Sequence, residues 1–146
     1  MRTRKRTIVG SVDPGRSALM ARVKGKNSKP ELTVRSQAHA LGFRFRLHQR
    51  NLPGTPDLVF PRLKKVVFVH GCFWHRHAGC SRTTNPKTRA KYWKEKFLRN
   101  VRRDRSVLTA IADQGWEALV VWECETFDHE RLSKKLKRYL SSRHLV

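Results

Sequence analysis

The sequence predicts a single α/β domain in which helices pack on the faces of a mixed β-sheet. Three observations carry this prediction. Segments with helical spacing of apolar side chains alternate with short segments rich in β-branched and aromatic residues. The segment KKVVFVH is apolar throughout its middle, as expected of a strand inside a sheet. The chain has 146 residues, 38% of them hydrophobic, which is enough for one core and too little for two ordinary domains.

A basic arm at residues 1–29 is expected to precede the folded domain at residues 30–146. The arm is rich in Arg, Lys, Ser and Gly and has few large apolar side chains, with one short helix expected around residues 17–23. An arm of this kind more often wraps a nucleic acid than packs in a core. A disordered, solvated tail is the alternative.

The folded domain is expected to begin with a helix from Pro30 that Gly42 stops. Proline is favoured in the first helical turn, Glu31 lies where the helix dipole favours negative charge, and glycine readily ends a helix. The apolar stripe of this helix consists of Leu32, Val34, Ala38 and Leu41.

Strands are expected at four places. The segment FRFRLH, residues 43–48, alternates apolar and basic side chains, which predicts a half-buried strand. In that strand the inward residues would be Phe43, Phe45 and Leu47, and the outward ones Arg44, Arg46 and His48. After a turn at residues 51–56, DLVF is a short strand, KKVVFVH is a central strand, and WEALVVWE is a further buried strand.

Between and after these strands the sequence predicts a loop and two more helices. The irregular loop at residues 71–86 is too long for a compact domain unless something orders it. A long basic helix follows at residues 87–114, and Gly115 ends it. A last amphipathic helix is expected from about Asp128 to Leu140. The apolar positions of the long helix are Tyr92, Trp93, Phe97, Val101, Leu108 and Ile111.

The charge of the chain predicts a polyanionic partner. Lys and Arg number 33 against 11 Asp and Glu, so the formal net charge is +22 and the pI is about 11.3. DNA or RNA fits this excess better than a membrane surface, because no apolar run approaches the roughly 20 residues of a membrane span. The first residues lack the apolar centre of a secretory signal, which predicts a cytosolic protein.

Three cysteines and a histidine have the spacing of a structural zinc site. Cys72, His77 and Cys80 follow the pattern C-x4-H-x2-C, and Cys124 comes directly after the strand VVWE. Zinc takes four tetrahedral thiolate or imidazole ligands, and short spacings let neighbouring side chains converge on one ion. An odd number of cysteines in a reducing compartment also argues against disulfides. His75 could take the place of His77, and three free thiols are the alternative to a metal site.

Asp57 and His70 are the candidates for a hydrolytic metal site. Asp57 opens one strand and His70 ends the next, so a hairpin would place them side by side at one edge of the sheet. Nucleases commonly hold Mg²⁺ with carboxylates, and the ion neutralises phosphate charge and orients the attacking water. The alternative for Asp57 is a carboxylate that caps a turn. In a chain of charge +22, the pair indicates a nuclease.

The motif that begins at Pro56 and Asp57 resembles that of the restriction-endonuclease superfamily, in which PD is followed on the next strand by E-x-K. Phe68, Val69 and His70 stand in place of E-x-K, so one carboxylate and one imidazole would have to serve. Four longer motifs, in order, make the chain similar to the very short patch repair endonucleases, which nick DNA beside a T:G mismatch. They are PGTPDLVF, FVHGCFWHRHAGC, YWKEKFLRNVRRD and LVVWEC, and the resemblance covers about residues 16–125. It implies a restriction-endonuclease-like sandwich.

The resemblance also implies the catalytic roles. Asp57 would hold a catalytic Mg²⁺ together with the backbone carbonyl of Val69, where family members often have Thr. His75 would act as general acid or base, with Asp104 orienting it. The remaining two positions are His70, which would contact the phosphate, and Glu31, which would order metal-bound water. On residues alone, Asp104 could pair with neighbouring arginines and Glu31 could serve only as a helix-terminal charge.

The resemblance also implies which residues contact DNA and which bind zinc. Phe73, Trp74 and Trp93 would push into the base stack at the mismatch, while Met20 of the arm would enter from the minor groove. Trp93 at helical spacing could instead be a core residue. The zinc ligands implied are Cys72, His77, Cys80 and Cys124, although Ala78 and Gly79 make the last local spacing one residue longer than in the best known members.

The function implied is strand-specific nicking 5′ to the thymine of a T:G mismatch, leaving 3′-hydroxyl and 5′-phosphate ends. The enzyme would be a monomer in the bacterial cytoplasm, associated with the nucleoid. Its partners would be mismatched double-stranded DNA, a repair polymerase, and a cytosine-5 DNA methyltransferase whose deaminated product is the T:G pair. Two alternatives are a restriction-type endonuclease that cuts matched DNA and a non-catalytic, zinc-containing DNA-binding module.

Overall fold

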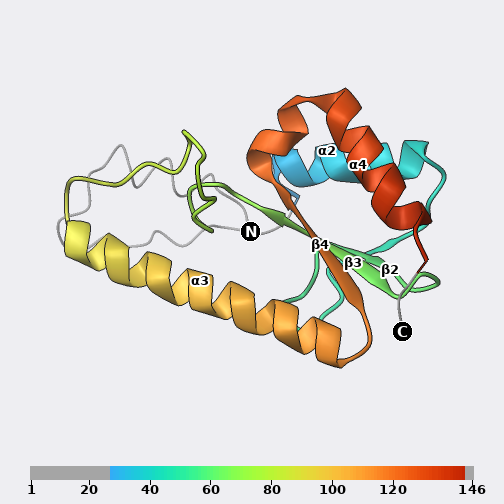
Figure 1. Ribbon diagram of the computed structural model, residues 1–146, viewed down its shortest axis with the longest axis horizontal. Coiled ribbons are helices and arrows are strands. Elements are labelled where there is room, and N and C mark those ends of the chain that lie inside the picture. Colours follow the sequence, from blue (N-terminus) through green and yellow to red (C-terminus); the bar gives the residue numbers. More distant parts are fainter. Residues whose placement is uncertain (1–26, 144–146) are drawn as a thin grey trace, which may run out of the picture.

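The structure, a computed structural model, describes residues 27–143, so Met20, the helix expected at residues 17–23 and nearly all of the arm lie outside the described residues. A four-stranded sheet lies between helices on both of its faces (Figure 1). The elements in chain order are α2 (Lys29–Ala40), β1 (Arg46–Leu47), β2 (Leu58–Phe60), β3 (Lys65–His70), α3 (Ala90–Asp113), β4 (Glu117–Trp122), η1 (Glu123–Phe127) and α4 (His129–Ser141).

The sheet is mixed, as predicted, with the strand order β1-β2-β3-β4. The pairs β1–β2 and β2–β3 are antiparallel, whereas β3 and β4 are parallel and end with His70 opposite Trp122. A parallel pair needs a long crossover connection, and α3 supplies it. The central position predicted for KKVVFVH is confirmed, because β3 has a neighbour on each side.

Alternate residues of β2 and β3 enter two separate hydrophobic clusters on the two faces of the sheet. On the face covered by α2 and α4, Leu58, Phe60 and Val67 pack against Leu132 and other apolar residues of the two helices. On the face covered by α3, the strands contribute Val59, Val66 and Phe68, which pack against Ile111 and Leu52. This alternation follows from the two-residue period of a strand and confirms the α/β sandwich.

The segment at residues 43–48 differs from the prediction. Phe43 and Phe45 pack against the core, but only Arg46–Leu47 pairs as a strand, and Leu47 is 40% exposed. His48 has φ 45°, in the left-handed region, so the backbone turns there and the alternation ends. The inward position predicted for Leu47 and the outward position predicted for His48 are therefore wrong.

The helices agree with the prediction apart from their limits. Ser28 caps α2, and its hydroxyl accepts a hydrogen bond from the backbone N–H of Glu31. Leu32 lies outside the apolar stripe expected for this helix, since it is 47% exposed. The long helix starts at Ala90 instead of residue 87, because Arg89 before it has φ 56° and ends the loop. The C-terminal helix is confirmed, with Asp128 as its cap.

Candidate functional site

A cavity of about 590 Å³ lies between the loop-facing ends of the strands and α3. Asp57 precedes β2, Val69 and His70 end β3, His75 lies in the following loop, and Asp104 is on α3. All five residues line the cavity, so the structure brings together five of the six residues with a predicted role in hydrolysis. The juxtaposition of Asp57 and His70, expected from hairpin geometry, is confirmed by the antiparallel β2–β3 pair.

Asp57 is a partly buried carboxylate with one close backbone donor. Its Oδ2 accepts a hydrogen bond of 2.7 Å from the backbone N–H of Val69, and its side chain is 17% exposed. Burial raises the pKa of Asp57 to about 6, and the nearby charge of Glu31 acts in the same direction, while the Val69 hydrogen bond opposes them. A divalent cation would offset this cost. Carboxylate and carbonyl oxygens are the ligands that Mg²⁺ prefers, so these residues fit such an ion.

Three further side chains that line the cavity form a connected group. The Nδ1 of His75 lies 2.6 Å from Asp104 Oδ2, and the ring of His75 stacks on that of His70 with centroids 3.9 Å apart. Burial and the neighbouring His75 lower the pKa of His70 to about 4, so His70 is neutral near pH 7. The Asp104 contact engages Nδ1 of His75 and leaves its Nε2 for proton transfer in the cavity.

Glu31 is close to this cavity but does not belong to the described residues that line it. Its carboxylate is 2% exposed and is held by the guanidinium of Arg35 and by His48, whose Nε2 lies 2.6 Å from Glu31 Oε2. His48 itself lines the cavity and lies 4.0 Å from Asp57 Oδ1. Sequence reasoning missed His48, because strand alternation placed it on the outer face.

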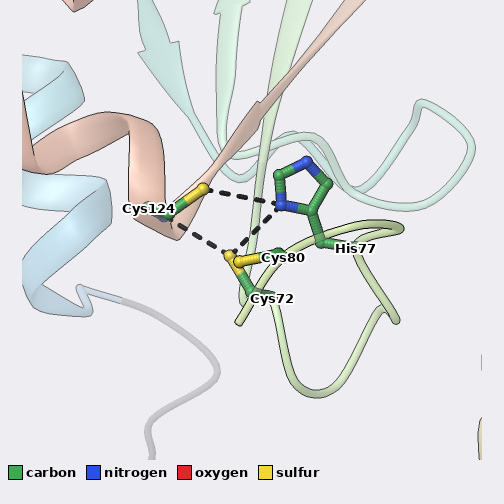
Figure 2. Close-up of side chains that lie close together, drawn as sticks. All are labelled: Cys72, His77, Cys80 and Cys124. Carbon is green, nitrogen blue, oxygen red and sulfur yellow. Dashed lines mark hydrogen bonds between the residues drawn. The ribbon is translucent and has the colours of Figure 1, made fainter. Parts of the chain in front are cut away.

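The four residues expected to bind zinc converge beside the end of β4 (Figure 2). Their ligand atoms, from Cys72, His77, Cys80 and Cys124, all lie within 4.8 Å of one another. The Nδ1 of His77 is 3.6 Å from Cys72 Sγ and 3.5 Å from Cys124 Sγ. Bond lengths of about 2.3 Å to sulfur and about 2.05 Å to nitrogen give a sulfur–nitrogen edge of about 3.6 Å in a tetrahedron around zinc. The spacing therefore fits a zinc ion, with His77 as the nitrogen ligand and His75 turned to the cavity.

The thiols of this cluster are chemically suited to a metal. All three cysteines are free. Burial raises the pKa of the Cys72 thiol well above its usual range, so the charge of a bound cation would be needed to hold it as a thiolate. The ring of His77 stacks on Trp122 with centroids 4.2 Å apart, and Thr83 donates a hydrogen bond to the His77 carbonyl, so the imidazole is already oriented.

The aromatic residues expected to probe DNA form one packed cluster. The ring centroids of Phe73 and Trp74 are 5.1 Å apart, and those of Trp74 and Trp93 are 5.8 Å apart. Trp93 is 7% exposed and packs against Phe97, as the core alternative from its spacing had suggested. The buried side chain of Asn100, which sequence reasoning missed, donates a hydrogen bond of 3.1 Å to the Trp74 carbonyl and anchors the cluster to α3.

Two arginines that sequence reasoning did not single out also border the cavity. Arg50 comes from the loop before β2 and Arg103 from α3, next to Asp104. Guanidinium groups at the rim of a cavity lined by histidines suit a phosphate group. Within residues 27–143, none of the helices is long and apolar enough to cross a bilayer.

The sequence is similar to those of several known proteins. Residues 12–82 match the family model described as DNA mismatch endonuclease Vsr. The chain is 35% identical to the DNA mismatch endonuclease Vsr of Escherichia coli K12 over 130 residues, covering 86% of this chain and 83% of that protein. It is 49% identical over 125 residues to the type II nicking enzyme V.XorIIP of Xanthomonas oryzae, covering 86% and 91%. It is also 35% identical to the type II nicking enzyme V.NaeI of Lentzea aerocolonigenes, covering 94% and 82%.

Proposed function

The chain belongs to the Vsr family and is a mismatch-specific DNA endonuclease, and we propose that it nicks one strand 5′ to the thymine of a T:G mismatch with a cation held by Asp57. The observation that carries the proposal is the cavity at the ends of the strands. The partly buried carboxylate of Asp57 and the His70, His75 and Asp104 group all line this cavity.

Asp57 and the backbone carbonyl of Val69 are the residues that would hold the catalytic cation, Mg²⁺. The bound ion supplies charge neutralisation of the scissile phosphate and a more acidic water. The raised pKa of Asp57 supports this assignment, because a carboxylate that is costly to ionise in the folded protein gains from a bound cation. Without that gain, the burial of Asp57 would only destabilise the domain.

His75 would transfer the proton in the nicking reaction. Its Nε2 would accept a proton from the attacking water or donate one to the leaving 3′ oxygen, while Asp104 holds the opposite nitrogen at 2.6 Å. His70, neutral near pH 7, would donate a hydrogen bond to a non-bridging phosphate oxygen. Arg50 and Arg103 would contact the same phosphate or its neighbours, as their positions at the cavity allow.

Mismatch selection would depend on the aromatic cluster. A T:G wobble pair is easier to unstack than a matched pair, so inserting apolar side chains selects it through deformation energy. Phe73 and Trp74, both partly exposed in the loop, are the side chains positioned to enter the stack. Trp93 would support them from α3, and Met20 of the arm would enter from the minor groove.

Zinc at Cys72, His77, Cys80 and Cys124 would be structural. The ion would tie the loop that carries Phe73, Trp74 and His75 to the end of β4, where Cys124 lies in η1. Its function would be to hold both the aromatic side chains and the catalytic imidazole in register with the sheet.

The biological setting proposed is very short patch repair at the bacterial nucleoid. A cytosine-5 DNA methyltransferase generates methylated cytosine, whose deamination gives thymine opposite guanine, and a repair polymerase would extend the 3′-hydroxyl end of the nick. One active site cuts one strand, so the enzyme would act as a monomer.

A nicking assay on a panel of duplexes tests the substrate assignment. Each duplex carries one mismatch or a matched pair at the same position, is labelled on both strands, and is incubated with the zinc-loaded protein and Mg²⁺. The proposal predicts cleavage of the thymine strand in T:G duplexes, with little cleavage of matched DNA. Cutting of both strands in matched DNA would establish the restriction-type alternative, and binding without any cleavage would establish a non-catalytic module.

A further inference from the structure

Glu31 and His48 form a second carboxylate–imidazole pair, which lies close to Asp57 and resembles the Asp104–His75 pair. Nε2 of His48 is 2.6 Å from Glu31 Oε2, the same separation as between His75 Nδ1 and Asp104 Oδ2. The side chain of His48 is 14% exposed, and the ring borders the cavity together with Asp57. Glu31, His48 and Asp57 place their ligand atoms within 4.8 Å of one another.

Glu31 has little capacity left for a ligand in the cavity. Its Oε2 contacts both the guanidinium of Arg35 and the ring of His48, and its Oε1 accepts a hydrogen bond of 3.1 Å from the backbone N–H of Asn27. The carboxylate is also almost completely buried. Besides its direct electrostatic effect on Asp57, Glu31 can therefore act on a cation at Asp57 through the ring of His48.

The backbone at His48 holds the ring in this position. His48 has φ 45°, a conformation that costs a residue with a Cβ about 1 kcal/mol or more and that persists only where the surroundings enforce it. Its N–H donates to the carbonyl of Asp57 at 3.4 Å, which continues the β1–β2 ladder by one residue. The strained residue is thus tied by its backbone to Asp57 and by its ring to Glu31.

We propose that His48 is a positioning residue of the cation site at Asp57, and that Glu31 acts on this site by orienting the His48 ring. The proposal rests on the assignment of Asp57 as a cation ligand. The Nε2 atom is too far from Asp57 Oδ1, at 4.0 Å, for a direct hydrogen bond, but a cation on Asp57 brings a shell of water that the ring can reach. Because Nε2 is engaged by Glu31, the ring would contact such a water through its other nitrogen and limit the orientations of the Asp57 carboxylate.

Binding of Mn²⁺ to the zinc-loaded protein without DNA tests the proposal independently of nicking. Mn²⁺ has the charge and oxygen preference of Mg²⁺, and the free ion is measured directly by electron paramagnetic resonance. His48→Ala is expected to weaken Mn²⁺ binding about 10-fold to 100-fold, as loss of residues that support metal ligands generally does. His48→Gln, whose amide can still donate to Glu31, is expected to recover part of the affinity. If the alanine variant does not fold, Mn²⁺ binding by His48→Gln tests the proposal.

A double-variant cycle separates the role of Glu31 from that of His48. Glu31→Gln is expected to weaken Mn²⁺ binding. The loss in the double variant with His48→Ala is expected to be smaller than the sum of the two single losses, because part of the effect of Glu31 passes through His48. His39→Ala is the matched control, since His39 is an exposed histidine on α2 remote from the cavity, and this variant is expected to bind Mn²⁺ normally.

The outcomes distinguish failure of this inference from failure of the proposed function. If His48→Ala and His48→Gln bind Mn²⁺ within twofold of the unmodified protein while Asp57→Asn abolishes binding, His48 is a bystander and the Asp57 assignment stands. Undiminished Mn²⁺ binding by Asp57→Asn would overturn the cation site itself, and this inference with it. Additive losses in the double variant would overturn the action of Glu31 through His48.

Discussion

His75 and His77 lie two residues apart in one loop, but their rings contact different groups. His75 Nδ1 binds the Asp104 carboxylate at 2.6 Å, and its ring stacks on His70. His77 Nδ1 lies 3.5 Å from Cys124 Sγ, and its ring stacks on Trp122. His70 and Trp122 are partners at the ends of the parallel strands β3 and β4, so one pair of strand ends supplies the platform for both imidazoles.

The difference between the two histidines shows that partner chemistry decides the role of a side chain. Sulfur neighbours would make His77 a ligand for a metal ion such as zinc, which would order the loop. A carboxylate neighbour would make His75 an oriented acid or base, and this role would require an ordered loop. Substitutions in the cysteine–His77 cluster should therefore remove both structure and activity. Substitutions in the His75–Asp104 pair should remove activity alone.

The largest effect is expected from substitution of a cysteine in the cluster around His77. Cys72→Ser removes a zinc ligand and is expected to lose the ion, the order of the loop, DNA binding and nicking together, since structural zinc contributes roughly 10 kcal/mol in small domains. Zinc content and thermal unfolding of the purified variant measure the loss. The matched variant is His75→Gln in the same loop, which should keep one zinc per chain. Normal zinc content in Cys72→Ser would contradict the ligand assignment.

A smaller effect, confined to activity, is expected from weakening the contact between Asp104 and His75. Asp104→Asn weakens the contact that orients His75, and is expected to lower the single-turnover nicking rate about 10²-fold to 10⁴-fold with zinc content unchanged. Asp113→Asn, at an exposed position at the end of the same helix, is the control and should nick normally. A rate for Asp104→Asn within threefold of the unmodified protein would make the Asp104 contact irrelevant to the reaction.

The smallest effect concerns stability and distinguishes the cation site from the zinc site. The pKa of Asp57 rises from 3.8 to about 6 on folding, so the folded protein holds this proton more tightly than the unfolded chain. The contribution of Asp57 to stability is therefore present below about pH 4 and is lost as pH rises through about 6. With zinc bound and no Mg²⁺ added, Asp57→Asn should become more stable than the unmodified protein above pH 6, by up to about 3 kcal/mol.

Urea unfolding of both proteins from pH 4 to pH 7 measures this difference, and the contribution of His70 cancels because both proteins contain it. Mg²⁺ should then stabilise the unmodified protein and leave Asp57→Asn unchanged. If the difference in unfolding free energy between the two proteins does not depend on pH, burial does not raise the pKa of the Asp57 carboxyl group.

Local sequence spacing was sufficient to predict strands β2 and β3 and the convergence of the cysteines with a histidine. The apolar residues of DLVF and the apolar run in KKVVFVH predicted β2 and β3, because burial on both faces dictates which residues a strand can contain. Cys72, His77 and Cys80 are close enough in sequence for short turns to bring them together. The hairpin then placed Asp57 beside the end of β3 without further information.

Features that depend on one backbone angle or on a distant contact could not be predicted this way. His48 faces the cavity because of a single left-handed residue, which the spacing of apolar side chains does not encode. Lys65 is fully buried at the start of β3, where its ammonium group donates to the backbone carbonyls of Tyr139 and Ser142 at the end of α4. A lysine in the sequence indicates an exposed position, and only the folded chain supplies those carbonyls.

The central claim, that the sulfur cluster maintains the fold while Asp57 enables the chemistry, is tested most directly by single-turnover nicking of a T:G duplex in Mg²⁺. Asp57→Asn and the unmodified protein are compared, with zinc content and DNA affinity determined on the same samples. We expect equal zinc, DNA affinity within about threefold, and a nicking rate lower by roughly a thousandfold or more. Nicking by Asp57→Asn within tenfold of the unmodified rate would contradict the claim.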